Sequence, residues 1–195
     1  MTRIIGGQGK GRRLATPRGL GTRPTAARVR QTLFDILAPE LPGCRFLDAF
    51  AGSGAVGLEA LSRGAARVVF VDTSAAALRS LRDNVAALRA AGGDVQVLRQ
   101  DARLALAVLG DDGVRFDVVY LDPPYDSDLY EPLLEQVGRL GLLEPGGLVV
   151  AEHFHKRDLP ETIGGLLRTR QVRVGDHRLS FYRAPPRRGR EEEGT

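Results

Sequence analysis

Two spacings of apolar residues alternate along residues 44–154: short continuous apolar runs and segments of helical periodicity. Short apolar runs rich in Val, Leu and Phe predict strands, and they cover 44–50, 67–72, 95–101, 116–122 and 147–154. The segments between them have a helical spacing of apolar residues and begin near Gly54, Ser74, Ala102 and Leu129. Strands separated by helices of this length predict right-handed βαβ units, in which helices cover both faces of a parallel sheet.

The two ends of the chain follow other patterns. Residues 24–37 have a helical spacing of apolar residues, and two prolines end it. Residues 168–183 contain two β-rich runs that meet at a Gly-Asp pair, which predicts a hairpin and an antiparallel edge of the sheet. We therefore expect a basic arm and a helix over residues 1–38, an α/β domain over 39–184 and a disordered tail over 185–195.

Charge is unevenly distributed along the chain, although the net charge is only +4. The segment before Asp35 holds eight Arg or Lys residues and no Asp or Glu. A segregated basic arm is typical of proteins that bind a polyanion, and we favour a nucleic acid over the alternative of a solvated arginine-rich tail. The candidate nucleic-acid-binding residues are Lys10, Arg12, Arg13, Arg23, Arg28 and Arg30.

Composition excludes several other classes of protein. The single cysteine, Cys44, rules out a disulfide within the chain and a cysteine-based zinc cluster, and its place in an apolar run predicts a buried filler. No segment approaches the roughly 20 apolar residues of a membrane span, and the N-terminus has no apolar leader pattern. We therefore expect a cytoplasmic protein without a membrane anchor.

The stretch FAGSGAVG, residues 50–57, contains the pattern G-x-G-x-x-G, and Asp72 follows Gly52 by 20 residues. This spacing matches the fingerprint of dinucleotide-binding enzymes. Asp48, however, ends the preceding strand, where a carboxylate would repel a pyrophosphate. It suits S-adenosylmethionine, which carries an ammonium and a sulfonium. The residues expected to hold the methionine end of that cofactor are Asp48, Phe50, Ala51, Gly52, Ser53 and Gly54.

Acids also end the later predicted strands. Asp72 is placed to accept hydrogen bonds from the ribose hydroxyls, and Asp101 from the adenine amine. Thr73 and Ala102 follow these acids and are assigned to the same site. Each acid could instead be a helix N-cap, because a helix begins shortly after it. Acids at successive strand ends meet at one rim of a parallel sheet, which favours the ligand.

The motif LDPPYD, residues 121–126, predicts the chemistry. Two prolines remove two amide donors and leave an acceptor-rich corner from Asp122 and the Pro123 carbonyl. That corner suits the exocyclic amine of a nucleobase, whose attack on a sulfonium methyl it would favour while Tyr125 stacks on the base. Asp122 could also accept the proton that the amine loses, and it belongs to both the catalytic and the cofactor site. The catalytic set is Asp122, Pro123, Pro124 and Tyr125.

The remaining polar residues give weaker signals. His153 and His155 are read as rim or surface residues, since the sequence offers no third metal ligand; no metal is expected. Glu152 is a candidate contact to the target base, and His177 a structural residue of the hairpin. Glu59 and Arg63 are expected to form a pair on a helix surface. Asn84 is expected to face outward or to cap locally.

Three segments together resemble the RsmD-type methyltransferases, over residues 3–183: FLDAFAGSGAVGLEALSRGA, DPPY, and RIIGGQGKGRRL with RPTAARVRQTLFDIL. The resemblance implies a class I, Rossmann-like fold with a mixed seven-stranded sheet whose last strand is antiparallel. It also implies methyl transfer from S-adenosylmethionine to the exocyclic N2 of a guanine in 16S ribosomal RNA. Two departures are Asp72, where relatives often have Glu, and Asp35, where the helix normally reads LFN.

Three alternatives stay open at this point. A DNA amino-methyltransferase shares the DPPY corner, but the chain leaves no room for a target-recognition insert. A nicotinamide oxidoreductase shares the glycine fingerprint. A non-catalytic RNA-binding assembly protein accounts for the basic arm but not for the acids at the strand ends. We expect a monomer whose partner is 16S rRNA within a small ribosomal subunit or an assembly intermediate.

Overall fold

The computed structural model describes residues 2–16, 24–88 and 92–185. Five parallel strands form the core of its sheet: β1 (Arg45–Asp48), β2 (Arg67–Asp72), β3 (Asp94–Arg99), β4 (Phe116–Leu121) and β5 (Leu143–Phe154). The helices between them are α2 (Ala55–Ser62), α3 (Ala75–Leu88), α4 (Ala102–Asp111) and α5 (Tyr130–Arg139). The predicted order of strands and helices is confirmed, although β5 begins four residues earlier than the pattern indicated.

The strand order is β3-β2-β1-β4-β5-β8-β7-β6. Strands β2 and β3 lie on one side of β1 in the sheet. Strands β4 and β5 follow later in the chain and lie on the other side of β1. The order therefore reverses between β1 and β4. In open α/β sheets a crevice forms at such a reversal, beyond the carboxyl ends of the strands.

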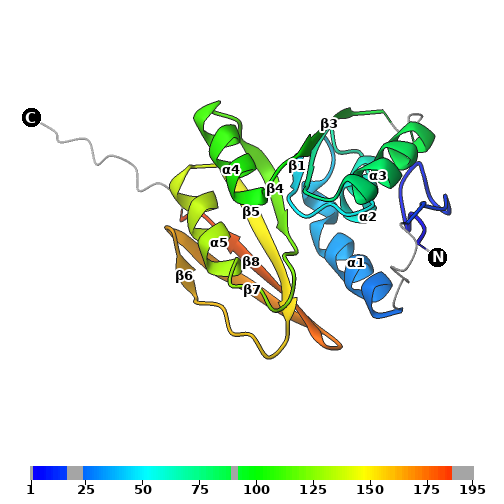
Figure 1. The fold of residues 1–195 in the computed structure, drawn as a ribbon. Coiled ribbons are helices and arrows are strands. Elements are labelled where there is room, and N and C mark those ends of the chain that lie inside the picture. The colour runs from blue at the N-terminus through cyan, green and yellow to red at the C-terminus, as the bar shows by residue number, and fades with distance from the viewer. Residues whose placement is uncertain (1, 17–23, 89–91, 186–195) are drawn as a thin grey trace, which may run out of the picture.

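Helices cover both faces of the sheet, as Figure 1 shows. On one face, α1 (Pro24–Leu37), α2 and α3 pack on β-strand residues such as Phe46 and Phe70. On the other face, α4 and α5 pack on residues such as Leu47 and Val119. Neighbouring residues of one strand thus belong to different cores. This explains why the strands read as continuous apolar runs instead of alternating ones.

The sheet has eight strands among the described residues, not the seven that the family resemblance implied. The predicted hairpin is confirmed as β7 (Leu166–Val174) and β8 (His177–Arg183), and β8 lies antiparallel beside β5. The additional strand is β6 (Thr162–Ile163), which pairs with the start of β7. Gly164 and Gly165 join β6 to β7 with φ of 56° and 81°, the two-residue turn that favours a tight hairpin.

The N-terminal arm, residues 2–16, lies against α2 and α3. Its ends approach each other at one isolated bridge between Arg3 and Arg13, and within the described residues the arm adds no strand to the sheet. Ile4 and Leu14 are 2% and 4% exposed and belong to the core on the α1 face. The arm is therefore packed on the domain by apolar anchors. Of the predicted tail, only residue 185 is described.

Candidate functional site

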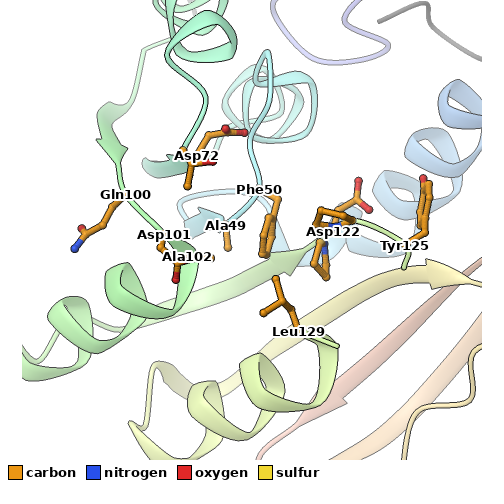
Figure 2. Close-up of a pocket in the computed structure, with 12 residues that line it drawn as sticks. Ala49, Phe50, Asp72, Gln100, Asp101, Ala102, Asp122, Tyr125 and Leu129 are labelled. Atoms are coloured by element: carbon orange, nitrogen blue, oxygen red, sulfur yellow. The ribbon is translucent and has the colours of Figure 1, made fainter. Parts of the chain in front are cut away.

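A cavity of about 460 Å³ opens where the strand order reverses. Its lining comes from the ends of β1, β2, β3 and β4: Ala49, Phe50, Asp72, Thr73, Gln100, Asp101, Ala102, Asp122, Pro123, Pro124, Tyr125 and Leu129. In Figure 2, Asp72 and Asp101 lie on one side, Asp122 and Tyr125 on the other, and the ring of Phe50 lies between them. The structure thus brings both predicted half-sites into one cavity.

Asp72, at the end of β2, holds the glycine-rich loop. Its Oδ2 accepts a hydrogen bond from the N–H of Gly52 at 2.8 Å, and its Oδ1 accepts from the N–H of Ser74 at 2.7 Å. An ionised carboxylate has about four lone-pair sites, so both oxygens can accept further hydrogen bonds from a ligand. One side chain therefore connects the loop after β1 with the cavity wall.

The three glycines of the G-x-G-x-x-G pattern have different surroundings. Gly52 has φ 53°, and a Cβ built on it meets no atom within 4 Å. Gly54 has φ 84°, and its Cβ would lie 2.2 Å from Leu81. Gly57 is helical, and its Cβ would lie 2.3 Å from the ring of Phe70 in β2. Only Gly52 leaves open space beside the loop, while the other two allow close packing of the loop and helix.

Asp48 lies behind the cavity and not in its lining. It is 1% exposed, and its Oδ2 accepts from the N–H of Gly57 at 2.9 Å. Burial raises its pKa to about 7, against the opposing effect of the hydrogen bond from Gly57. Ala51, Gly52, Ser53 and Gly54 are likewise outside the lining. Of the six residues expected to hold the methionine end, the structure places only Phe50 on the cavity wall.

Asp101 caps α4 and also faces the cavity. Its Oδ1 accepts from the N–H of Arg103 at 2.9 Å, which is N-cap geometry. Its Oδ2 has no hydrogen-bond partner among the described residues. The capping and ligand-binding readings of Asp101 are thus compatible, because each uses a different oxygen.

The LDPPY motif forms the opposite wall of the cavity. Burial raises the pKa of Asp122 well above its usual range, and the negative charges of Glu152 and Asp48 raise it further. The Pro123 carbonyl accepts a hydrogen bond from the buried Tyr130 hydroxyl at 3.2 Å. Tyr125 is 43% exposed at the edge of the cavity. The predicted acceptor corner is present, with a side chain of α5 fixing its backbone.

A polar network lies beside Asp122. Two of its members, Tyr125 and Glu152, were predicted from the sequence to contact the target base, whereas His177 was predicted to be a structural residue of the hairpin. The Glu152 carboxylate accepts a hydrogen bond from the Tyr120 hydroxyl and lies 2.9 Å from His177 Nδ1. His177 Nδ1 in turn lies 3.5 Å from the Tyr125 hydroxyl. His177 comes from the antiparallel hairpin, far along the chain. No spacing signal could have joined it to a motif at residues 121–125.

Three residues read as surface groups are buried. His153 is 0% exposed, and its Nε2 lies 2.8 Å from the Ser180 hydroxyl; burial lowers its pKa. Glu59 is also 0% exposed and accepts from the N–H groups of Ile5 and Gly6, at 2.7 Å each, besides Arg63. The helix-surface interpretation of Glu59 was wrong, because the arm covers that face of α2.

Asn84 is the third of these residues, and it is 3% exposed. Its Nδ2 donates to the carbonyls of Ala15 and Ser53, both at 2.9 Å, and its Oδ1 accepts from the N–H of Ala15 at 2.7 Å. This side chain of α3 therefore joins the N-terminal arm to the glycine-rich loop. The outward orientation expected from the sequence was wrong, since the pattern could not show that the arm returns to α3.

The basic candidates are divided between the surface and the interior. Lys10, Arg12, Arg13 and Arg28 are exposed, and Arg23 lies outside the described residues. Arg30 is only 9% exposed; its Nη2 donates to the Arg3 carbonyl at 2.8 Å, and burial lowers its pKa. Arg30 is therefore not available to a nucleic acid here and acts instead as a link between α1 and the arm.

Cys44 is 4% exposed, which confirms the interpretation as a buried filler, and burial raises its pKa to about 12. Within residues 2–16, 24–88 and 92–185, no three His, Cys, Asp or Glu side chains are grouped as a metal site would require. None of the described helices has the length and apolarity to cross a bilayer.

Comparison with known proteins places this site in a family. Residues 2–183 match the family model described as Conserved hypothetical protein 95. Ribosomal RNA small subunit methyltransferase D of Escherichia coli is 40% identical over 158 residues, which cover 81% of this chain and 77% of the relative. Its namesake in Haemophilus influenzae is 36% identical over 150 residues, with 77% of each chain covered.

Solved structures agree with this grouping. The Escherichia coli protein yhhF superposes with a TM-score of 0.80 and 36% identity, over 94% of this chain and 98% of the other. A 16S rRNA methyltransferase of Thermus thermophilus, solved with AdoMet and guanosine, has a TM-score of 0.67, 24% identity and coverage of 86% and 45%. It shares the fold alone, which is the class I methyltransferase fold. On the family match and the identity to its relatives, this chain belongs to the RsmD family of methyltransferases.

Proposed function

We propose that the protein transfers a methyl group from S-adenosylmethionine to the exocyclic N2 of a guanine in small-subunit ribosomal RNA. The observation that carries this proposal is the position of the LDPPY corner, which shares one cavity with two acids at the ends of β2 and β3. The names of the relatives support a ribosomal RNA substrate. The choice of guanine N2 rests on the family resemblance.

The residues present fit the cofactor. A cavity of about 460 Å³ lies within the range of small-molecule sites, roughly 300–1,000 Å³. Asp72 would accept hydrogen bonds from the ribose hydroxyls, and Asp101 Oδ2 from the adenine amine. The backbone beside Gly52 is open to the methionine portion. Asp48 would act behind it as a negative charge that favours the ammonium, instead of as a direct contact.

The cofactor supplies an electrophilic methyl group on a sulfonium. The protein's part is to present the amine to it. Asp122 and the Pro123 carbonyl would accept the two hydrogens of the amine and orient its lone pair, while Tyr125 stacks on the base. Transfer would form the new N–C bond with loss of S-adenosylhomocysteine, and N2 would then have one proton to lose. The raised pKa makes Asp122 a stronger base than an exposed carboxylate and so a suitable acceptor for that proton.

The test uses tritiated cofactor with three substrates: 16S rRNA and small subunits from a strain lacking this gene, and plasmid DNA. We expect the tritium label to appear in the RNA at one guanine. In cellular 16S rRNA that guanine should be unmethylated in the strain lacking the gene and methylated after complementation. Asp122→Ala should abolish transfer while S-adenosylhomocysteine still binds. Label in DNA would favour the DNA amino-methyltransferase. Tight binding of NADH with none of S-adenosylhomocysteine would favour an oxidoreductase and contradict the proposal.

A further inference from the structure

An aromatic ridge leads away from the mouth of the cavity. It consists of Tyr125, His177 and Phe154. The Tyr125 and His177 rings meet edge to face with their centroids 5.3 Å apart. Phe154 is the cross-strand neighbour of His177 in the β5–β8 register, so it continues the row on the same face of the sheet. The ridge thus joins the LDPPY corner to the hairpin of β7 and β8.

Phe154 is unusual among the aromatic residues beyond the cavity, because its side chain is 36% exposed at the end of β5. The His155 ring lies 4.6 Å from its centroid, and Lys156 Nζ lies 5.9 Å from it. An exposed ring with a cation beside it resembles the stacking surfaces that bind single-stranded nucleic acid, where a base lies on the ring and the cation meets a phosphate.

Positive charge without an ion pair lies on the same hairpin, on the other face of the sheet from the ridge. In the β5–β8 register Arg178 is the cross-strand neighbour of His153, whereas His177 is that of Phe154. Arg173 and Arg178 are directly opposite each other in the β7–β8 register. Like charges at such positions destabilise a sheet.

Arg173 Nε donates to the Gly175 carbonyl at 2.9 Å, and among the described residues neither guanidinium has a carboxylate within ion-pair distance, since nearby Asp176 and Glu152 lie beside His155 and His177. Arg157 and Arg168, by contrast, each pair with two carboxylates. The hairpin end therefore keeps two cations together without protein counter-charges, which suits a phosphate backbone.

We infer that the aromatic ridge and the Arg173–Arg178 pair bind the RNA strand next to the target guanine. A neighbouring base stacks on Phe154, and the backbone passes over the end of the hairpin to reach the arginine pair on the other face. This inference rests on the proposed function, since it assigns a path to the strand whose base enters the cavity. The N-terminal arm is then one of two RNA-contacting surfaces. Stacking selects no particular base, so the ridge contributes affinity and leaves recognition of the target to the cavity.

The test measures methylation of small subunits purified without this enzyme, as kcat and KM, together with filter binding to protein-free 16S rRNA. Phe154→Ala should raise KM and the RNA dissociation constant about tenfold, within the effect of losing one base–aromatic stack. Phe154→Leu keeps an apolar side chain but should behave like Phe154→Ala, and Phe154→Tyr should stay close to wild type. The kcat values and S-adenosylhomocysteine affinity should not change.

The arginine pair is tested by salt dependence. Arg173→Ala and Arg178→Ala should each lower the slope of log affinity against log salt by about 0.7, the value for one lost phosphate contact on a single strand. Leu104→Ala and Arg115→Ala serve as controls: Leu104 is 59% exposed on α4, and Arg115 precedes β4 at the opposite end of the sheet. Neither should change RNA binding.

The outcomes separate the two proposals. Wild-type enzyme that methylates no small-subunit RNA contradicts the proposed function. Active enzyme whose KM and RNA affinity are indifferent to Phe154→Ala contradicts the ridge alone. If Phe154→Ala raises KM for small subunits but leaves the affinity for protein-free RNA unchanged, Phe154 contacts a ribosomal protein and not RNA. That result also overturns the inference. Wild-type affinity of the Phe154→Leu variant for RNA would show that Phe154 supplies only apolar contact and no stacking, which contradicts the inference.

Discussion

The backbone N–H of Gly57 donates a hydrogen bond to the carboxylate of Asp48, with 2.9 Å between N and Oδ2. This contact ties the last glycine of the fingerprint to the acid that ends β1. It forms in the interior, because Asp48 is 1% exposed and α2 lies directly on the sheet. The acid that distinguished this chain from a dinucleotide enzyme is therefore part of the helix packing as well.

The first prediction concerns pH. The pKa of Asp48 is about 7 in the folded protein and lies near 4 in an unfolded chain. The folded state thus binds this proton more tightly, which stabilises it at low pH; that stability is lost as pH rises through about 7. Relative to Asp48→Asn, wild type should lose on the order of 4 kcal/mol of unfolding free energy between about pH 4 and pH 8. Urea unfolding of the two ligand-free proteins at a series of pH values measures this change. A difference in unfolding free energy between them that stays constant with pH would contradict the prediction.

The second prediction separates two glycines of one motif. Gly57→Ala should lower the free energy of unfolding by about 1–3 kcal/mol, because its Cβ would lie 2.3 Å from the Phe70 ring. Gly52→Ala should cost about 1–2 kcal/mol through its positive φ, without a clash. Adding Phe70→Leu should recover part of the loss at Gly57 and none at Gly52. Equal recovery at both positions would contradict the packing argument.

The third prediction concerns the bridge from the arm to the glycine-rich loop. Asn84→Ala removes three buried hydrogen bonds, to Ala15 twice and to Ser53 once. We expect about 2–3 kcal/mol lower stability and weaker binding of S-adenosylhomocysteine, since the loop loses its support. Gln136→Ala, which breaks an exposed amide contact on α5, is the control. Unchanged affinity for S-adenosylhomocysteine would show that the loop holds its shape without Asn84.

The fourth prediction concerns arm docking. Glu59→Gln keeps one acceptor oxygen where Ile5, Gly6 and Arg63 need two, so it should lower stability by about 3 kcal/mol. It should also speed tryptic cleavage in the arm. Glu135→Gln breaks an exposed Glu–Arg pair of the same helical spacing and should cost less than about 0.5 kcal/mol. Similar costs for both variants would mean that burial of Glu59 contributes little.

The fifth prediction concerns the catalytic corner. Tyr130→Phe removes the hydroxyl that donates to the Pro123 carbonyl. We expect kcat to fall about tenfold, as for one misplaced positioning contact, while KM for the cofactor is unchanged. Tyr182→Phe is a matched control, because its hydroxyl donates to the Pro160 carbonyl at 2.9 Å, away from the cavity. It should lose similar stability and keep wild-type kcat. A fall in kcat for both would indicate a general loss of stability.

Much of the fold could be read from local patterns. Apolar runs and helical spacing determine β1 to β5 and α2 to α5, because each pattern decides which residues must leave water. Acids placed at strand ends, Asp72, Asp101 and Asp122, reach one cavity for a topological reason: parallel strands end at one edge of the sheet. Those residues could be predicted without knowing any contact between distant segments.

By itself, the sequence determined the succession of strands and helices, the family and the acids at the strand ends. Only the tertiary structure decided which polar side chains are interior. Glu59 and Asn84 are buried because the arm folds back over α2 and α3, and Arg30 because it reaches the Arg3 carbonyl. His177 meets Tyr125 because β8 pairs antiparallel with β5. Such contacts join residues far apart in the chain, and a local pattern of apolar and polar positions records only which face is covered, not what covers it.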